Sequence, residues 1–326
     1  MTTQSVVPVL VAGATGRQGG ATARALIAAG IPVRALVRDP ATDRAKAVEA
    51  LGAELITGDL DDPGSVRRAA EGARAVFSVQ MPDMDGRGFD GEVAQAVNLI
   101  EGTRAAGVPQ FVHTSVSGAG QHVSWVKDQW AWMEPYYSAK AGIQDRVREA
   151  GFRHWTLIKP GFFMENFLPS ARIMFPRGVE GGLVTLLKPA TQLSLVAVAD
   201  IGTAAAAAIA GPERLDRAEL ELAGDFLSMT DIAATLSRAL GVELAAPDMT
   251  GEEATAAGMP DMGFAQACIN EEPQPARPGF AKDLGLPLTT FEEWARDQFR
   301  GNGQQGTSSD DLSAADAPYE GTRESG

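Results

Sequence analysis

The sequence predicts an α/β fold in which helices cover both faces of a doubly wound parallel sheet. Three observations lead to this prediction. Short apolar strands alternate with helices over residues 1–160, the connections between them are short, and a glycine-rich turn joins the first strand to the first helix. Such alternation is typical of parallel sheets, because each return to the same edge of the sheet needs a crossover helix.

Apolar runs and helical spacing predict the individual elements. The expected strands are Val9–Ala12, Val33–Val37, Glu54–Thr57, Ala75–Val79, Gln110–Ser115 and His154–Ile158. The expected helices begin near Arg17 and then cover Thr42–Leu51, Pro63–Ala70, Phe89–Ala106 and Tyr136–Ala150. Each of these helices is followed by a glycine, the residue that most readily ends a helix in the left-handed conformation.

The turn after the first strand contains Gly13, Gly16 and Gly19, a G-x-x-G-x-x-G spacing. A dinucleotide pyrophosphate needs a tight turn, a backbone that it can approach closely, and free N–H groups at a helix N-terminus. Glycine supplies the first two because it has no Cβ, and the helix that begins near Arg17 supplies the third. The strand before the turn and the helix after it favour dinucleotide binding over glycines that serve close packing alone.

Arg38 follows the second strand, where such a fold meets the adenosine ribose. An acidic residue there would accept hydrogen bonds from the 2′-hydroxyl of NAD, whereas arginine suits the 2′-phosphate of NADP. The neighbouring Asp39 could serve NAD if Arg38 turned outward, and a solvated arginine at a strand end is the plainer alternative. We expect NADP(H) to be preferred over NAD(H).

The pattern changes after Pro160 to an aromatic, irregular stretch followed by further strands and helices. We predict that residues 1–160 and about 195–227 form a Rossmann-type dinucleotide-binding domain. Residues from about 161 to 194 and 228–300 would form a smaller C-terminal substrate-covering domain. The polar segment 301–326 has few apolar side chains and is expected to be a disordered tail.

Composition narrows the class of protein. The 326 residues carry a formal net charge of −14, which disfavours binding to nucleic acid or electrostatic attachment to a membrane. No apolar run is long enough to span a membrane, and no signal peptide is visible. Cys268 is the single cysteine and the three histidines lack a metal-ligand pattern, so we expect a cytoplasmic protein without a metal.

Ligands of parallel sheets bind beyond the carboxyl ends of the strands. Asp59 and Leu60 follow the third strand, and Asp59 could accept a hydrogen bond from the adenine amino group or serve only as a turn residue. Val79 and Gln80 follow the fourth strand and could line the adenine and ribose site. The long loop 117–134 contains three tryptophans, which suggest an apolar lid or a loop held to the core by its aromatic side chains.

Tyr136 and Lys140 form a Y-x-x-x-K pair on one helix face. In the reduction of a carbonyl the oxygen needs a proton, and a nearby ammonium is expected to lower the pKa of a phenol that donates it. Ser115 and Ser117 are alternative candidates for the hydroxyl that polarises the substrate, and Tyr137 could replace Tyr136. A packing tyrosine beside a solvated lysine is the plainer alternative.

Several of these segments together resemble the NmrA-like family, an atypical branch of the short-chain dehydrogenase/reductase superfamily. The resemblance runs from about Val7 to about Gly241. The segments that carry it are Gly13-Ala14-Thr15-Gly16-Arg17-Gln18-Gly19, Val37-Arg38-Asp39-Pro40, Gly58-Asp59-Leu60, Tyr137-Ser138-Ala139-Lys140, Lys159-Pro160-Gly161-Phe162-Phe163-Met164-Glu165-Asn166 and Val198-Ala199-Asp200-Ile201-Gly202.

The resemblance implies a Rossmann domain with a small C-terminal substrate domain, and NADP more often than NAD. It implies cofactor contacts at Thr15, Gln18, Arg38, Asp59, Gln80, Lys140 and the turn Phe163–Asn166. Together with the glycine-rich turn and the strand ends, the expected cofactor-binding residues are Gly13, Thr15, Gly16, Arg17, Gln18, Gly19, Arg38, Asp59, Leu60, Val79, Gln80, Lys140, Pro160, Phe163 and Asn166.

The family implies two kinds of function. Some members are reductases similar to quinone and isoflavone reductases, and others lack the catalytic tyrosine and act as redox-sensing regulators through protein contacts. Tyr136 favours a reductase of a small apolar carbonyl, quinone or enone, with Tyr136, Lys140 and Ser115 as catalytic residues. The alternatives are a mechanism centred on Lys140 as general acid/base, and a non-catalytic NAD(P) sensor with a protein partner.

Overall fold

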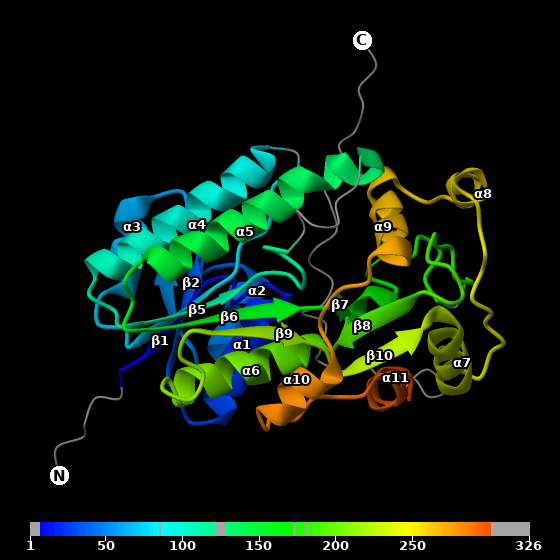
Figure 1. The fold of residues 1–326 in the computed structure, drawn as a ribbon. Helices are drawn as coiled ribbons and strands as arrows, with labels where there is room; N and C mark the ends of the chain where they lie inside the picture. Colours follow the sequence, from blue (N-terminus) through cyan, green and yellow to red (C-terminus); the bar gives the residue numbers. More distant parts are fainter. Residues whose placement is uncertain (1–6, 85, 122–127, 172–173, 180, 301–326) are drawn as a thin grey trace.

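The computed structural model describes residues 7–84, 86–121, 128–171, 174–179 and 181–300, and it confirms the predicted α/β fold (Figure 1). A seven-stranded sheet has the order β3-β2-β1-β4-β5-β6-β9, and every neighbouring pair in it is parallel. Its strands are β1 (Val9–Val11), β2 (Val33–Val37), β3 (Glu54–Thr57), β4 (Ala75–Ser78), β5 (Gln110–Thr114), β6 (His154–Pro160) and β9 (Ala218–Leu222).

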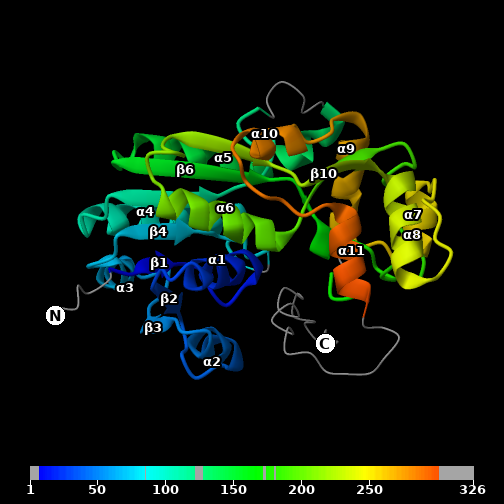
Figure 2. The same ribbon diagram turned by 90° about the horizontal axis from the view of Figure 1, so that it is seen from below.

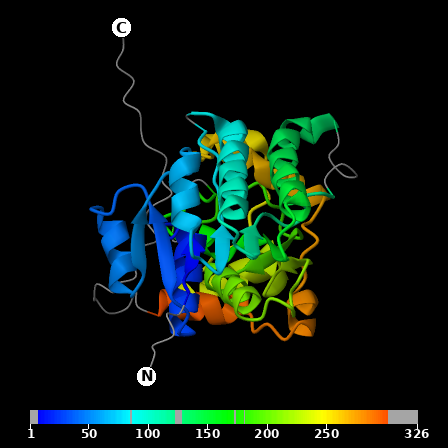
Figure 3. The same cartoon turned by 90° about the vertical axis from the view of Figure 1, so that its left-hand side faces the viewer.

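Two layers of helices enclose this sheet (Figure 3). One face is covered by α1 (Arg17–Ala28) and α6 (Val198–Ala210), which pack closely against each other. The other face is covered by α3 (Pro63–Ala70), α4 (Gly88–Ala105) and α5 (Glu134–Glu149). The remaining crossover helix, α2 (Asp43–Ala50), follows β2 and contacts β3.

Alternate residues of the central strand β1 are buried in opposite layers. Val9 and Val11 belong to the core cluster that includes Leu26 of α1 and Ile201 of α6. Leu10 belongs to the cluster on the other face, which includes Leu99 of α4. A strand covered on both faces has no polar side, and this explains the uninterrupted apolar run in the sequence.

A smaller lobe continues from the carboxyl end of β6 and is seen at one end of the molecule (Figure 2). Its three-stranded sheet has the order β10-β8-β7 and contains β7 (Phe162–Phe163), β8 (Gln192–Val196) and β10 (Asp225–Ser228). The helices α7 (Met229–Leu240) and α11 (Phe291–Phe299) pack together beside it. The short helices are α8 (Gly251–Ala256), α9 (Gln266–Glu271) and α10 (Pro278–Asp283).

The two sheets are connected through α6, which follows β8 of the small sheet and leads to β9 of the large one. A Cβ added to Gly202 would lie 2.5 Å from the backbone of Ala21, so glycine is required where α6 crosses α1. Glu165 of the small lobe accepts hydrogen bonds from the backbone N–H of Val198 at 3.0 and 3.1 Å. The start of α6 is therefore capped by a side chain from the other lobe.

The structure differs from the sequence prediction mainly in the irregular regions. The two-residue β7, the strand β10 and the short helices of the small lobe were not predicted. In the loop 117–134, residues Asp128–Met133 form a 3₁₀ helix and Trp132 is half exposed, while Trp125 and the tail 301–326 lie outside the described residues. Within the described ranges, no helix combines the length and apolarity needed to cross a bilayer.

Candidate functional site

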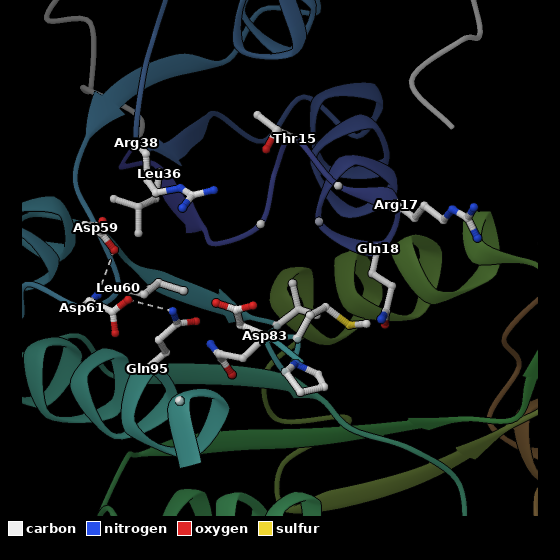
Figure 4. Close-up of a pocket in the computed structure, with 18 of the residues that line it drawn as sticks. Thr15, Arg17, Gln18, Leu36, Arg38, Asp59, Leu60, Asp61, Asp83 and Gln95 are labelled. Carbon is white, nitrogen blue, oxygen red and sulfur yellow. Dashed lines mark hydrogen bonds between the residues drawn. The ribbon is translucent and has the colours of Figure 1, made fainter. Parts of the chain in front are cut away.

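A cleft of about 800 Å³ opens at the carboxyl ends of β1 to β4 (Figure 4). Thirteen of the expected cofactor-binding residues line it: Gly13, Thr15, Gly16, Arg17, Gln18, Gly19, Arg38, Asp59, Leu60, Val79, Gln80, Phe163 and Asn166. The structure therefore brings together residues from the start of α1, the ends of four neighbouring strands and the β7 turn. Lys140 and Pro160, which were also expected in this set, do not line the cleft.

The glycine-rich turn forms one wall of the cleft. Gly13 has a φ of +65°, and a Cβ on Gly19 would lie 2.2 Å from the carbonyl oxygen of Gly13, so α1 packs directly onto the turn. The N-cap of α1 is Gly16, with no side-chain cap and no acidic residue in the first turn. The first amides of α1 thus stay available to an anion, and the bare backbone fits a pyrophosphate.

Arg38 and Asp39 have different surroundings, although they are adjacent in the chain. The exposed Arg38 lines the cleft and makes no hydrogen bond or ion pair with the residues that the structure describes, and its guanidinium points into the cleft in Figure 4. Asp39 does not line the cleft, and its Oδ1 accepts a hydrogen bond of 2.8 Å from the backbone N–H of Ala41. A cation, rather than a carboxylate, therefore faces the ligand position at the end of β2.

The rim of the cleft beyond β3, next to Arg38, carries a hydrogen-bonded group of polar side chains. Asp59 lines the cleft and also accepts a hydrogen bond of 2.9 Å from the backbone N–H of Asp61. Asp61 in turn pairs with Arg87 and accepts a hydrogen bond of 3.0 Å from Gln95. These hydrogen bonds, from Arg87 first and then Gln95, lower the pKa of the Asp61 carboxyl. Asp59 is thus both a turn residue and a cleft residue.

Sequence reasoning missed part of the lining. The missed residues are Leu36, Val37, Gly58, Asp61, Met81, Pro82, Asp83, Arg87, Gly91 and Gln95. Most of them are adjacent in sequence to predicted site residues at the strand ends. The loop after β4 could have been predicted by extending the expected lining beyond Gln80. Gln95 gave no signal, because it is one polar residue on a long amphipathic helix.

The three expected catalytic residues lie outside the cleft lining. Lys140 is buried and its ammonium pairs with the carboxylate of Glu92, a residue of α4. The hydroxyl of Ser115 accepts a hydrogen bond of 2.8 Å from Gln144, and the hydroxyl of Ser117 donates to Glu221 at 2.6 Å. Both candidate serines are buried and bonded within the protein.

Tyr136 lies beside Lys140, with the ammonium nitrogen 5.7 Å from the centre of the phenol ring. The expectation that this ammonium lowers the pKa of the phenol is wrong for this arrangement. Burial raises the pKa of Tyr136, and Tyr137 and the carboxylate of Glu92 raise it further. Glu92 also offsets the charge of Lys140, so this ammonium does not counteract the effect of burial on the phenol.

The fold and the cleft define the class: a dinucleotide-binding α/β protein with a small C-terminal lobe. The family model of the NmrA-like family matches residues 6–266, and the chain belongs to this family. The expected resemblance is thereby confirmed.

The chain is similar to curated and solved proteins over most of its length. It is 30% identical to an NAD(P)H azoreductase of Xenophilus azovorans over 88% of this chain and 96% of that protein. It superposes on a quinone oxidoreductase of Escherichia coli complexed with NADPH with a TM-score of 0.69 at 23% identity, over 89% of this chain and 99% of the other. It also superposes on NmrA, a negative transcriptional regulator in complex with NAD, with a TM-score of 0.71 at 20% identity, over 92% and 99%.

Proposed function

We propose that this protein is an NADPH-dependent reductase of a small apolar carbonyl, quinone or enone. The proposal is carried by two features of the same cleft: the bare backbone amides at the start of α1, and Arg38, which makes no hydrogen bond or ion pair with the described residues. The cradle suits the pyrophosphate, and the guanidinium suits a 2′-phosphate that NADPH has and NADH lacks. The azoreductase similarity supports a nicotinamide reductase in general.

The nicotinamide, when bound, would supply the hydride, and this chain would supply the proton. The hydride would go to the substrate carbon, the π electrons of the carbonyl would move to its oxygen, and this oxygen would take a proton from the hydroxyl of Tyr136, whose O–H bond breaks as the new O–H bond forms. The ammonium of Lys140 would then return a proton to the phenolate and regain one from water. Phe163, which lines the cleft beside Asn166, would contribute an apolar surface toward the small lobe.

The test is NADPH oxidation with a panel of carbonyls, quinones and enones, using the wild type, Tyr136→Phe and Tyr137→Phe. We expect Tyr136→Phe to lower kcat about 100-fold or more, because a general acid contributes roughly that factor. Tyr137→Phe is the matched control, since this neighbouring ring contacts Tyr136 but is not the proposed donor. Equal turnover by the wild type and Tyr136→Phe would remove Tyr136 from the mechanism.

A second function is a non-catalytic NAD(P) sensor that presents a surface to a protein partner. One observation favours it: none of Tyr136, Lys140 and Ser115 lines the cleft. The similarity to NmrA, a transcriptional regulator, points the same way. The sensor predicts no turnover with any panel member, together with a cofactor-dependent change in oligomer size or in partner capture.

A further inference from the structure

A group of polar side chains is buried between α4, α5 and the carboxyl ends of β4 and β5. We call Glu92, Lys140, His113 and Ser78 the Glu92 cluster. The Oγ of Ser78 lies 3.1 Å from Nδ1 of His113 and 3.2 Å from Nε2 of Gln80, and Gln80 itself lines the cleft. The cluster therefore lies directly behind the wall of the cleft.

The ion pair in this cluster is almost entirely removed from solvent. The side chain of Glu92 is 1% exposed and that of Lys140 is 9% exposed. Among the described residues, Oε2 of Glu92 and Nε2 of His113 are buried with no hydrogen-bond partner. A buried, incompletely bonded ion pair is no more stable than apolar side chains of similar volume. Its presence at this position is therefore better explained by what it does to its neighbours.

The neighbour that it affects is Tyr136. Within the part of the chain that the structure describes, the charged and titratable groups around this ring are Lys140 and Tyr137 from α5 and Glu92 from α4, with His113 of β5 near Lys140. The ring also makes an edge contact with Phe89 of α4, with the ring centres 5.9 Å apart. Lys140 by itself would favour the phenolate, whereas Glu92 opposes it.

We propose that Glu92 is a positioning residue for the Tyr136–Lys140 pair: it holds the ammonium in place and neutralises it, so that Tyr136 stays protonated until substrate oxygen takes the proton. The role in catalysis rests on the proposed reductase function, but the electrostatic effect on Tyr136 does not. Glu92 itself exchanges no proton in this scheme.

The effect is measurable without turnover, because the chain has only three tyrosines. In a background of Tyr137→Phe and Tyr319→Phe, Tyr136 is the single source of tyrosinate absorbance near 295 nm. We expect the tyrosinate of this background to form only at a pH well above the usual range of tyrosine, because burial raises the pKa of Tyr136, and to form at a lower pH once Glu92→Gln is added. Circular dichroism at each pH separates titration from alkaline unfolding.

Glu92→Asp gives a graded second variant, since its shorter carboxylate retreats from Lys140 but keeps its charge. The midpoint of the tyrosinate titration is expected to be highest with Glu92, lower with Glu92→Asp and lowest with Glu92→Gln. If the Gln variant does not fold, the comparison of Glu92→Asp with the wild type is the test. Glu221→Gln is the control, because Glu221 pairs with the buried Lys159 at 3.1 Å on β6 and has no contact with Tyr136.

Two results overturn the proposal. One is a tyrosinate midpoint that is the same in the wild-type, Asp and Gln proteins. The other is an equal shift of the tyrosinate midpoint in the Glu221→Gln control, which would mean that any lost buried ion pair destabilises the structure around Tyr136. A wild-type protein without turnover, by contrast, would remove the reductase function and leave the titration result standing.

Discussion

The cleft and the Glu92 cluster lie on the two sides of Gln80, and their charged side chains differ in exposure and in pairing. In the cleft, Arg38 is exposed and makes no hydrogen bond or ion pair with the described residues, and the first amides of α1 are uncapped. In the cluster, Lys140 is buried and its charge is matched by Glu92. An exposed charged side chain without an oppositely charged partner attracts a ligand, whereas a buried ion pair changes the pKa values of the groups around it. Substitutions in the cluster should therefore affect stability, and substitutions in the cleft should affect binding.

The largest expected effect is that of Lys140→Met, which removes one partner of the buried pair. The carboxylate of Glu92 would remain in a dry site without its cation, and we expect the free energy of unfolding to fall by about 3–5 kcal/mol. Urea denaturation at neutral pH measures it.

Lys188→Met is the matched control for this substitution. Lys188 also pairs with a carboxylate, that of Asp248 at 2.7 Å, but both side chains are about half exposed or more. We expect its loss to cost less than about 1 kcal/mol. If Lys140→Met and Lys188→Met lowered the free energy of unfolding equally, burial of the ion pair would make no difference to stability.

The second effect concerns His113, which burial keeps neutral. Burial, followed by the charge of Lys140, lowers its pKa from 6.5 to about 3. Between these values the unfolded chain binds a proton that the folded chain does not, so stability is full above pH 6.5 and is lost as the pH falls. We expect the free energy of unfolding to be about 2 kcal/mol lower at pH 5 than at pH 7 from this residue.

His113→Asn removes this titration and identifies its source. The difference in unfolding free energy between the two pH values should shrink by about the same 2 kcal/mol in the variant. An undiminished difference would show that other groups produce the pH dependence, and that His113 is not held neutral by its surroundings.

The cleft could be predicted from the sequence, whereas the Glu92 cluster could not. The cleft was accessible because its signals are local: three glycines in one turn, and polar residues directly after apolar strands, all brought to one edge by the parallel topology. Glu92 gave no such signal, since it is one of several carboxylates on an amphipathic helix and meets Lys140 only when α4 packs on α5. The expectation of a lowered phenol pKa failed mainly because burial, which raises that pKa, depends on the packing around Tyr136, and also because it considered Lys140 without its partner Glu92.

The small lobe shows the same limit for the fold. Its strand β7 has two residues and pairs with β8, some 30 positions further along the chain. The sequence of an aromatic pair such as Phe162 and Phe163 is compatible with a loop or a strand until the pairing with β8 is known. In the large sheet, by contrast, each crossover helix repeats the same local pattern, and the predicted strands were confirmed to within two residues at each end.

The smallest effect on stability is expected in the cleft itself, for Arg38→Ala. The side chain is exposed and makes no hydrogen bond or ion pair within the described structure, so the free energy of unfolding should change by less than about 0.5 kcal/mol. Binding should respond instead: calorimetric titration is expected to show about a tenfold or greater loss of NADPH affinity with NADH affinity unchanged. Arg68→Ala is the control, since Arg68 on α3 is also exposed but lies outside the cleft lining. Equal affinity of the wild type for NADPH and NADH would mean that Arg38 faces solvent rather than a phosphate, and the argument from Arg38 for NADPH would fail.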